Sequence, residues 1–263
     1  MAAVINWKDV TYYESHRCLP YINSFRNSDE IRIPAHSQDA YTVPGDSTIL
    51  VEGKVVYEPK SQGANKDVTR NVSLTNNAAA YLFDQVRYEL NGVEIDRSRH
   101  NGITSTARTL LTCTKDEAAS FEIAGFGSPT LNSDGTFRFL VELAHFLGFA
   151  KDTKGCFIVR QKQELVLVRS RTDKNAYVLK DGAEEDAVTI AVTNVEWHLH
   201  HVKFNMAAEK ALMDLVQQNA VFQIIFDSWE THEYPQLPQN NKETWKLMTT
   251  SDAEAPSHIF LVL

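Results

Sequence analysis

Histidine side chains gather next to a carboxylate in one short stretch of the chain, EWHLHH at residues 196–201. If this stretch is a strand, Glu196, His198 and His200 project from the same face, because side chains alternate between the two faces of a strand. Two histidines at this spacing supply half of the ligands of a zinc site. Metal chemistry is therefore the first chemistry to weigh for this chain.

The residues around the histidines do not complete such a site. A cupin-type oxygenase would carry a glycine shortly before the histidine pair and a glutamate shortly after it. No glycine occurs after Gly182, and residues 202–206 hold no carboxylate. We therefore expect no metal and no cofactor. The histidine pair is interpreted as the polar outer face of a strand whose inner face carries Trp197 and Leu199, with His201 on the inner side.

A second group with possible chemistry is Glu230, His232 and Glu233, which stand just before Tyr234 and a proline. Two carboxylates and an imidazole at the end of a strand could bind a metal or act as an acid and base pair. We interpret them as a solvated strand terminus. The chain contains no GxSxG, Walker, GxGxxG, HExxH or CxxC motif, so no enzyme is predicted.

The cysteines and the N-terminus indicate the cellular compartment of the protein and do not point to a reaction. Cys18, Cys113 and Cys156 are odd in number and lack metal-ligand spacing, which favours buried thiols in a reducing environment. The first residues carry no secretory signal, and no apolar run approaches the roughly 18 residues of a membrane span. We expect a protein that is not secreted and has no membrane partner.

The formal net charge of −8 disfavours nonspecific binding to nucleic acid, because the summed field repels phosphate. Two small basic groups are interpreted as partners of neighbouring carboxylates or of a subunit interface. They are Arg97, Arg99 and His100, and Arg169, Arg171 and Lys174.

Residues 86–97 predict a tight hairpin, because Asn91 and Gly92 join two alternating segments. The expected pairs are Leu90 with Val93, Tyr88 with Ile95 and Arg87 with Asp96. The alternation places Val86, Tyr88, Leu90, Val93 and Ile95 on one face. On the charged face Glu89 stands opposite Glu94, so that face requires water or a basic neighbour.

Strand patterns recur along the chain and predict an all-β fold, an eight-stranded antiparallel jelly-roll sandwich with short helical insertions. The run Leu165 to Val168 predicts a central strand, and a change of phase near Thr193 and Asn194 predicts a bulge. The expected strands are 29–34, 47–57, 86–91, 93–98, 157–169, 187–203, 220–230 and 257–263. The apolar Leu263 indicates a strand paired to its last residue or a longer protein cut at this point.

One domain is expected over residues 1–263. It begins with an N-terminal segment, residues 1–28, and carries a partly helical insertion at 99–156 and a helix at 206–219 that Asn205 caps. Residues 74–85 predict helical turns with Asn76 or Asn77 as the N-cap.

Several phrases of the sequence resemble one family: SDEIRIP, LTNNAAAYLFDQVRYELNGVEIDRSRHNGITS, ELVLVRSRTDKNAY and FDSWETHEYPQLP. The family is the double jelly-roll capsid-like proteins of Maverick/Polinton elements and adintovirus-like DNA viruses in insect and other animal genomes. The resemblance implies a major capsid protein whose jelly rolls stand upright in the shell and assemble as trimers with a pseudo-sixfold outline. It also implies that only the first of two jelly rolls is present.

The expected function is thus that of a structural, non-catalytic protein of a virion, or of a virus-derived element inside a cell. Its partners would be further copies of itself or a second jelly roll, with no specific nucleic acid and no small-molecule substrate. Its important residues would be packing residues, namely the inward face of the hairpin, Trp197, Phe222, Phe226 and Trp229. The alternative is a jelly-roll module that binds a ligand or carbohydrate through its loops.

Overall fold

In the computed structural model, residues up to Glu230 form one compact unit, and Thr231–Leu263 form a second, small unit. The described part of the second unit contains no helix or strand. The structure describes residues 7–35, 40–61, 66–127, 129–159, 161–218, 220–234, 239, 242, 244–245, 256 and 258–261.

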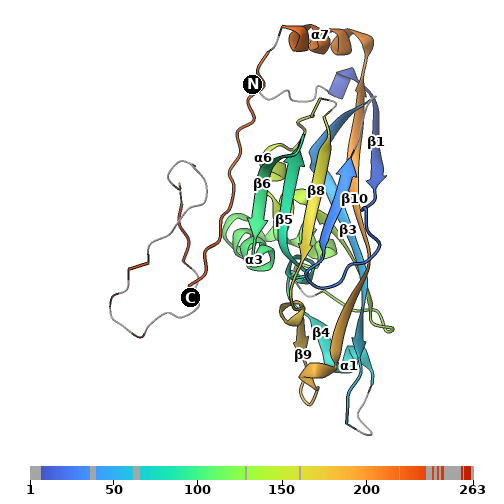
Figure 1. Ribbon diagram of the computed structural model, residues 1–263, viewed down its shortest axis with the longest axis vertical. Helices are drawn as coiled ribbons and strands as arrows, with labels where there is room; N and C mark the ends of the chain where they lie inside the picture. The colour runs from blue at the N-terminus through green and yellow to red at the C-terminus, as the bar shows by residue number, and fades with distance from the viewer. Residues whose placement is uncertain are drawn as a thin grey trace. The chain divides into compact units, whose positions relative to one another are not determined.

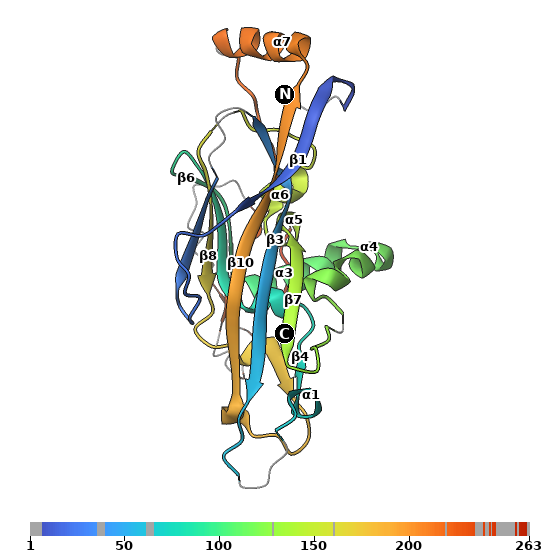
Figure 2. The ribbon, with the colours of Figure 1, turned by 90° about the vertical axis from the view of Figure 1, so that its right-hand side faces the viewer.

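Two four-stranded antiparallel sheets form the first unit and face each other as two layers (Figures 1 and 2). Every connection between successive strands of these sheets crosses to the opposite sheet except the β5–β6 hairpin, which is the wrapping of a jelly roll. The first sheet has the order β1 (Val10–Cys18), β10 (Val188–Phe204), β3 (Tyr41–Tyr57), β7 (Thr136–Glu142). The second has the order β2 (Glu30–Ala35), β8 (Gln163–Arg169), β5 (Phe83–Leu90), β6 (Val93–Arg99).

The described residues form ten strands rather than the expected eight, because β4 (Val72–Leu74) and β9 (Tyr177–Leu179) make a separate two-stranded ribbon. Two further expected strands are wrong. Residues 220–230 are extended but join no sheet, and the described residues of 257–263 form no strand; positions 257, 262 and 263 lie outside the described residues.

The two main sheets still contain eight strands, because β1 and β7 are present and were not expected. The sequence pattern revealed neither of them. The segment 1–28 contains β1, whose residues are exposed on both faces and therefore show no alternation. The insertion 99–156 contains β7, where a short strand runs directly into a helical turn. The strand expected over 157–169 spans only β8, since Ile158 makes a single bridge to Thr42.

The hairpin confirms the turn but corrects the register. Asn91 and Gly92 both have positive φ, and Leu90 pairs with Val93 and Glu89 with Glu94 as expected. A bulge at Ile95 then shifts the ladder, so that Tyr88 faces Asp96 and Arg87 faces Arg97. The expected pairs Tyr88–Ile95 and Arg87–Asp96 are therefore wrong. The bulge turns Asp96 away from water, and its side chain is buried.

The bulge predicted in the long strand β10 is confirmed. Its pairing with β3 shifts register between Val192 and Asn194. Because one residue is inserted there, the odd-numbered Val195, Trp197 and Leu199 point into the core, and all three are fully buried. A second shift follows between His198 and His200.

Helices occupy the connections between strands. Asn205 caps α7 as expected, with its side-chain oxygen accepting the Ala208 N–H at 2.9 Å. Between β6 and β8 lie α3 (Asn101–Thr112), α4 (Lys115–Ser120), the 3-10 turn η2 (Phe121–Ala124), α5 (Leu143–Phe146) and α6 (Gly148–Asp152). The others are η1 (Trp7–Asp9), α1 (Val68–Asn71), α2 (Ala78–Tyr81), η3 (Lys174–Ala176), η4 (Glu185–Ala187) and α7 (Met206–Gln217).

The core between the sheets is built around Trp197. Its ring meets Tyr88 of the opposite sheet edge-on, with the ring centroids 6.3 Å apart, and its Nε1–H donates to Ser47 Oγ at 2.9 Å. Gly53 of β3 lies beneath the Phe137 ring, where a Cβ would collide, which explains a glycine inside this strand.

Replacing Trp197 tests this packing. Trp197→Ala is expected to lower the free energy of unfolding by roughly 3–5 kcal/mol, because it removes a fully buried indole and leaves a cavity between the sheets. Urea titration followed by circular dichroism measures the change. Leu140→Ala is the control, since Leu140 on β7 is 36% exposed and its loss should cost far less. Equal losses in the two variants would contradict the assignment of Trp197 to the core.

Candidate functional site

The structure ties Glu196 into a structural network rather than an open ligand set. Its carboxylate accepts hydrogen bonds from Arg17 Nε at 2.8 Å, Asn194 Nδ2 at 2.9 Å and His198 Nε2 at 3.0 Å. Arg17 comes from β1, so these bonds tie the edge strand to β10. Hydrogen bonds, that of Arg17 foremost, lower the pKa of Glu196 to about 2.

His200 does not join this network. Its ring stacks on Tyr13 of β1, with the ring centroids 5.0 Å apart. Glu196, His198 and His200 were predicted to share one face, but they do not act as one group. Glu196 and His198 bond to each other, whereas His200 stacks on Tyr13. Within the ranges that the structure describes, no group of three or more His, Cys, Asp or Glu side chains is arranged to hold a metal ion.

The group Glu230, His232 and Glu233 stands where no strand forms, so its interpretation as a strand terminus is wrong. Glu230 is the last residue of the first unit, and the other two belong to the second. Residues 220–230 alternate in exposure like a strand, but none of the described strands pairs with them.

The two basic groups differ in burial. Arg97 lies 3.4 Å from Glu94, and His100 lies 3.7 Å from Asp84, both near the surface. Arg169 is buried, and its guanidinium pairs with Asp173 at 2.9 Å and donates to the Leu82 carbonyl oxygen. Arg169 therefore secures the end of β8, while Arg171 and Lys174 are exposed.

The charged face of the second sheet acquires the basic neighbour that the sequence required. Arg32 of β2 reaches Glu164 at 2.7 Å and Glu89 at 3.7 Å, and Arg87 reaches Glu89 at 2.9 Å. The two arginines flank Val166 of the central strand β8 and leave it fully buried although it points outward. Because the two arginines are its cross-strand neighbours, their aliphatic stems can cover this apolar side chain while their guanidinium groups pair with carboxylates.

A buried polar cluster links the helices to the sheets, and nothing in the sequence pattern revealed it. The Asn77 side chain donates to Ser105 and Thr106 at 2.9 Å, and its oxygen lies 3.0 Å from His145 Nε2. Asn77 is the N-cap residue of α2, as the sequence suggested, but its side chain makes no capping bond. Its amide instead joins α3 to α5.

Two charged residues extend this cluster. Asp96 accepts the Phe149 N–H of α6 at 2.8 Å, which satisfies a helix-end donor with a buried carboxylate. Arg108 of α3 donates to the Ala144 carbonyl at 2.7 Å and to that of His145. Burial raises the pKa of Asp96 and lowers that of Arg108. Arg108 thus ties α5 to α3, and Asp96 ties α6 to β6.

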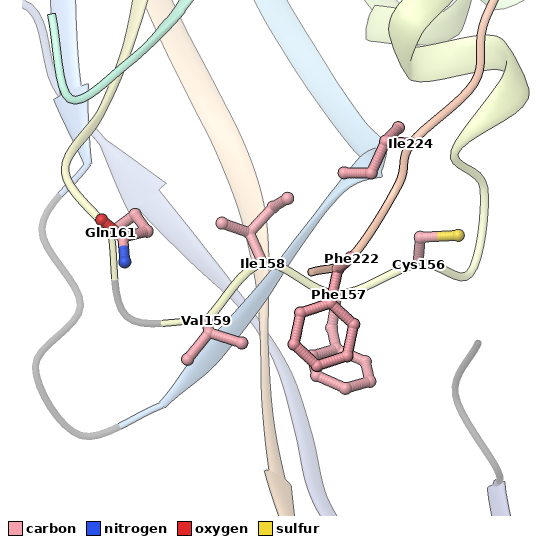
Figure 3. Close-up of a pocket in the computed structure, with 7 residues that line it drawn as sticks. All are labelled: Cys156, Phe157, Ile158, Val159, Gln161, Phe222 and Ile224. Carbon is pink, nitrogen blue, oxygen red and sulfur yellow. The ribbon is translucent and has the colours of Figure 1, made fainter. Parts of the chain in front are cut away.

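The segment that follows α7 packs against the first unit's helices and strands through further apolar side chains. It passes over α6, where the Asp227 carbonyl lies against Gly148 and Phe226 meets the Phe149 ring edge-on at 5.4 Å. Phe222 and Ile224 line a cavity of about 170 Å³ (Figure 3). The other lining residues are Cys156, Phe157, Ile158, Val159 and Gln161. Among the described lining residues, most side chains are apolar and Gln161 supplies an amide group.

Large apolar side chains are exposed on one group of helices. Ile103, Leu110 and Leu111 of α3 and Ile123 of η2 are between 41% and 67% exposed. Exposed apolar groups that cluster on one element mark interaction surfaces more often than isolated ones do. No helix among the described residues has the length and apolar character needed to span a membrane.

Comparison with known proteins places the architecture. Residues 72–263 match the family described as the double jelly roll-like domain. No curated protein matches the chain.

Solved viral structures share the fold at low sequence identity. The structure of PBCV-1 VP54, fitted into a reconstruction of the virophage Sputnik, is 14% identical with a TM-score of 0.51; the match covers 79% of this chain and 46% of that one. The Faustovirus major capsid protein is 10% identical with a TM-score of 0.53, covering 82% and 57%. The Sputnik virophage structure is 9% identical with a TM-score of 0.53, covering 78% and 50%. This chain thus spans about half the length of the structures it matches.

The buried histidine of the polar cluster gives a prediction about acid stability. Burial lowers the pKa of His145 to about 3. Below pH 6.5 the unfolded chain therefore binds a proton at His145 that the folded chain does not bind. The contribution of His145 to the free energy of unfolding is present above pH 6.5 and is lost as the pH falls toward 3. This one group should contribute a slope of up to about 1.4 kcal/mol per pH unit.

Urea titrations at several pH values between these limits measure the slope. His145→Gln should be less stable at neutral pH and should lose that part of the pH dependence. The exposed His258 provides the control, because His258→Gln should keep the slope of the natural chain. An unchanged slope in His145→Gln would show that this imidazole is not the group responsible.

Proposed function

Because the chain belongs to the double jelly roll-like domain family, we propose that it is a structural capsid protein that assembles through contacts between copies. The observation that carries the proposal is the pairing order of the two sheets, β1-β10-β3-β7 and β2-β8-β5-β6, within the family match. The shared fold of viral capsid structures supports it. A virion is the corresponding location.

The proposal includes the state of assembly. This chain spans about half the length of the matched viral structures, so it corresponds to one jelly roll where those chains have room for two. Residues 7–230 would form one of several jelly rolls that stand side by side in the assembly. Six copies, or three copies each joined to a second jelly roll, would complete a closed ring with a pseudo-sixfold outline. The proposal further includes an origin in Maverick/Polinton elements or adintovirus-type viruses. The sequence phrases that resemble proteins of these elements support this origin.

The proposal also treats the protein as non-catalytic and without cofactor or small-molecule substrate. Its support is the way in which the reactive side chains are used. Glu196 is engaged by Arg17, and His145 by Asn77, each within hydrogen-bonding distance. These residues hold elements together, and none of them faces the cavity beside Cys156.

The test is the state of the full 263-residue chain in solution. Size-exclusion chromatography with light scattering, followed by negative-stain microscopy, should show concentration-dependent trimers, rings or shells. A strict monomer at every concentration, also after its second jelly roll is supplied, would contradict the proposal. Saturable binding on a glycan array by such a monomer would support the ligand-binding module instead.

A surface variant sharpens this test. Leu110→Ser combined with Leu111→Ser should weaken assembly, because it removes exposed apolar area from α3 without opening the core. Val178→Ser is the matched control, since Val178 is also about half exposed but lies on the separate β4–β9 ribbon. Equal assembly of the two variants would remove α3 from the contact surface.

A further inference from the structure

The seam between β1 and β10 collects four of the nine histidines of the chain. His16 of β1 stacks on His201 of β10 with the ring centroids 4.0 Å apart and the planes 18° from parallel. His200 stacks on Tyr13, and His198 lies opposite Arg17. Strand β1 is the edge of its sheet and, among the described strands, pairs only with β10, so this seam decides whether the strand stays in place.

The groups around the stacked imidazoles are few and unevenly placed. Glu14 is the nearest carboxylate, with its Oε2 3.9 Å from His16 Nε2, and Tyr12 Oη lies 3.3 Å from the same nitrogen. The other charged groups that face the seam are Asp46 of β3 beside His200, Glu196 and Arg17 beside His198, and Lys203 over the Tyr12 ring.

Protonation opposes the stacked arrangement. Two positive charges at 4.0 Å repel each other strongly in a partly buried site, whereas neutral imidazoles stack. Burial, reinforced by His16, lowers the pKa of His201 to about 4. Burial also lowers the pKa of His200. A released strand takes up these protons near pH 6.5, so the stability of the seam is present above that pH and declines below it.

The two ends of β1 are held by contacts that acid of this strength does not break. At one end Arg17 binds Glu196, whose pKa of about 2 keeps it charged. At the other end the Asp9 carbonyl accepts the Asn205 N–H at 2.7 Å, and Val10 packs against a small apolar cluster.

We propose that residues 12–16 of β1 separate from β10 in mildly acidic solution when His201, which stacks on His16, takes up a proton, while both ends of the strand stay attached. The seam is then a pH-sensitive latch on one edge of the first sheet. Its opening uncovers the unpaired edge of β10, which is a surface that another strand can join.

Hydrogen exchange followed by mass spectrometry tests the latch on the full chain. On going from about pH 7.5 to about pH 5, amides of residues 12–16 should exchange about tenfold faster after correction for the intrinsic rate. Amides of the buried strand β8 should keep their protection and serve as the internal reference. Unchanged exchange of residues 12–16 over this interval would overturn the proposal.

Two variants identify the group responsible from opposite strands. His201→Gln leaves a neutral amide that cannot gain a proton, so it should remove most of the acid response of residues 12–16. His16→Gln removes only the stacked ring that reinforces the effect of burial on His201, so it should reduce the response. His258→Gln is the control and should respond like the natural chain. Because the two variants act separately, one that fails to fold leaves the other as the test. A folded variant that keeps the full response would show that the stack is not the sensor.

Discussion

The long antiparallel pairing of β3 with β10 is the interaction on which the rest of the structure depends. Both strands run for 17 residues, and β10 also holds β1 while β3 holds β7. The bulge between Val192 and Asn194 keeps apolar side chains pointing inward on both sides of the shift. Without the inserted residue, Trp197 would face water and its bond to Ser47 would be lost.

The second constraint is polar and concerns the helical connection between the two sheets. Helices of four or five residues such as α5 and α6 are not stable alone, because so few residues cannot offset the cost of nucleation. Asp96 and Arg108 supply what these helices lack, since each binds backbone groups at a helix end. A buried hydrogen-bonded cluster thus acts together with the apolar packing of Leu143, Phe146 and Phe149 to order this region.

The sequence predicted features that depend on local pattern and missed those that depend on distant partners. The turn at Asn91, the bulge in β10 and the Asn205 cap all follow from neighbouring residues, and all three were found. Strand β1 was missed because its register is set by β10, nearly 180 residues away. Asp96 was assigned to the solvent face because the bulge at Ile95 leaves no local signal. The partners of Glu196 were likewise invisible before Arg17 was placed beside it.

Several reactive residues of the first unit hold elements of the fold together. Glu196 joins β1 to β10, Arg169 secures the end of β8, and Asn77 joins α3 to α5. Hydrogen bonds and ion pairs of this kind fix the arrangement of the strands and helices. Under the proposed capsid function, contacts between copies would form through the surfaces that this shape presents. The apolar face of α3 and the histidine seam of β1 are such surfaces, and they differ in chemistry, since one depends on apolar area and the other on pH.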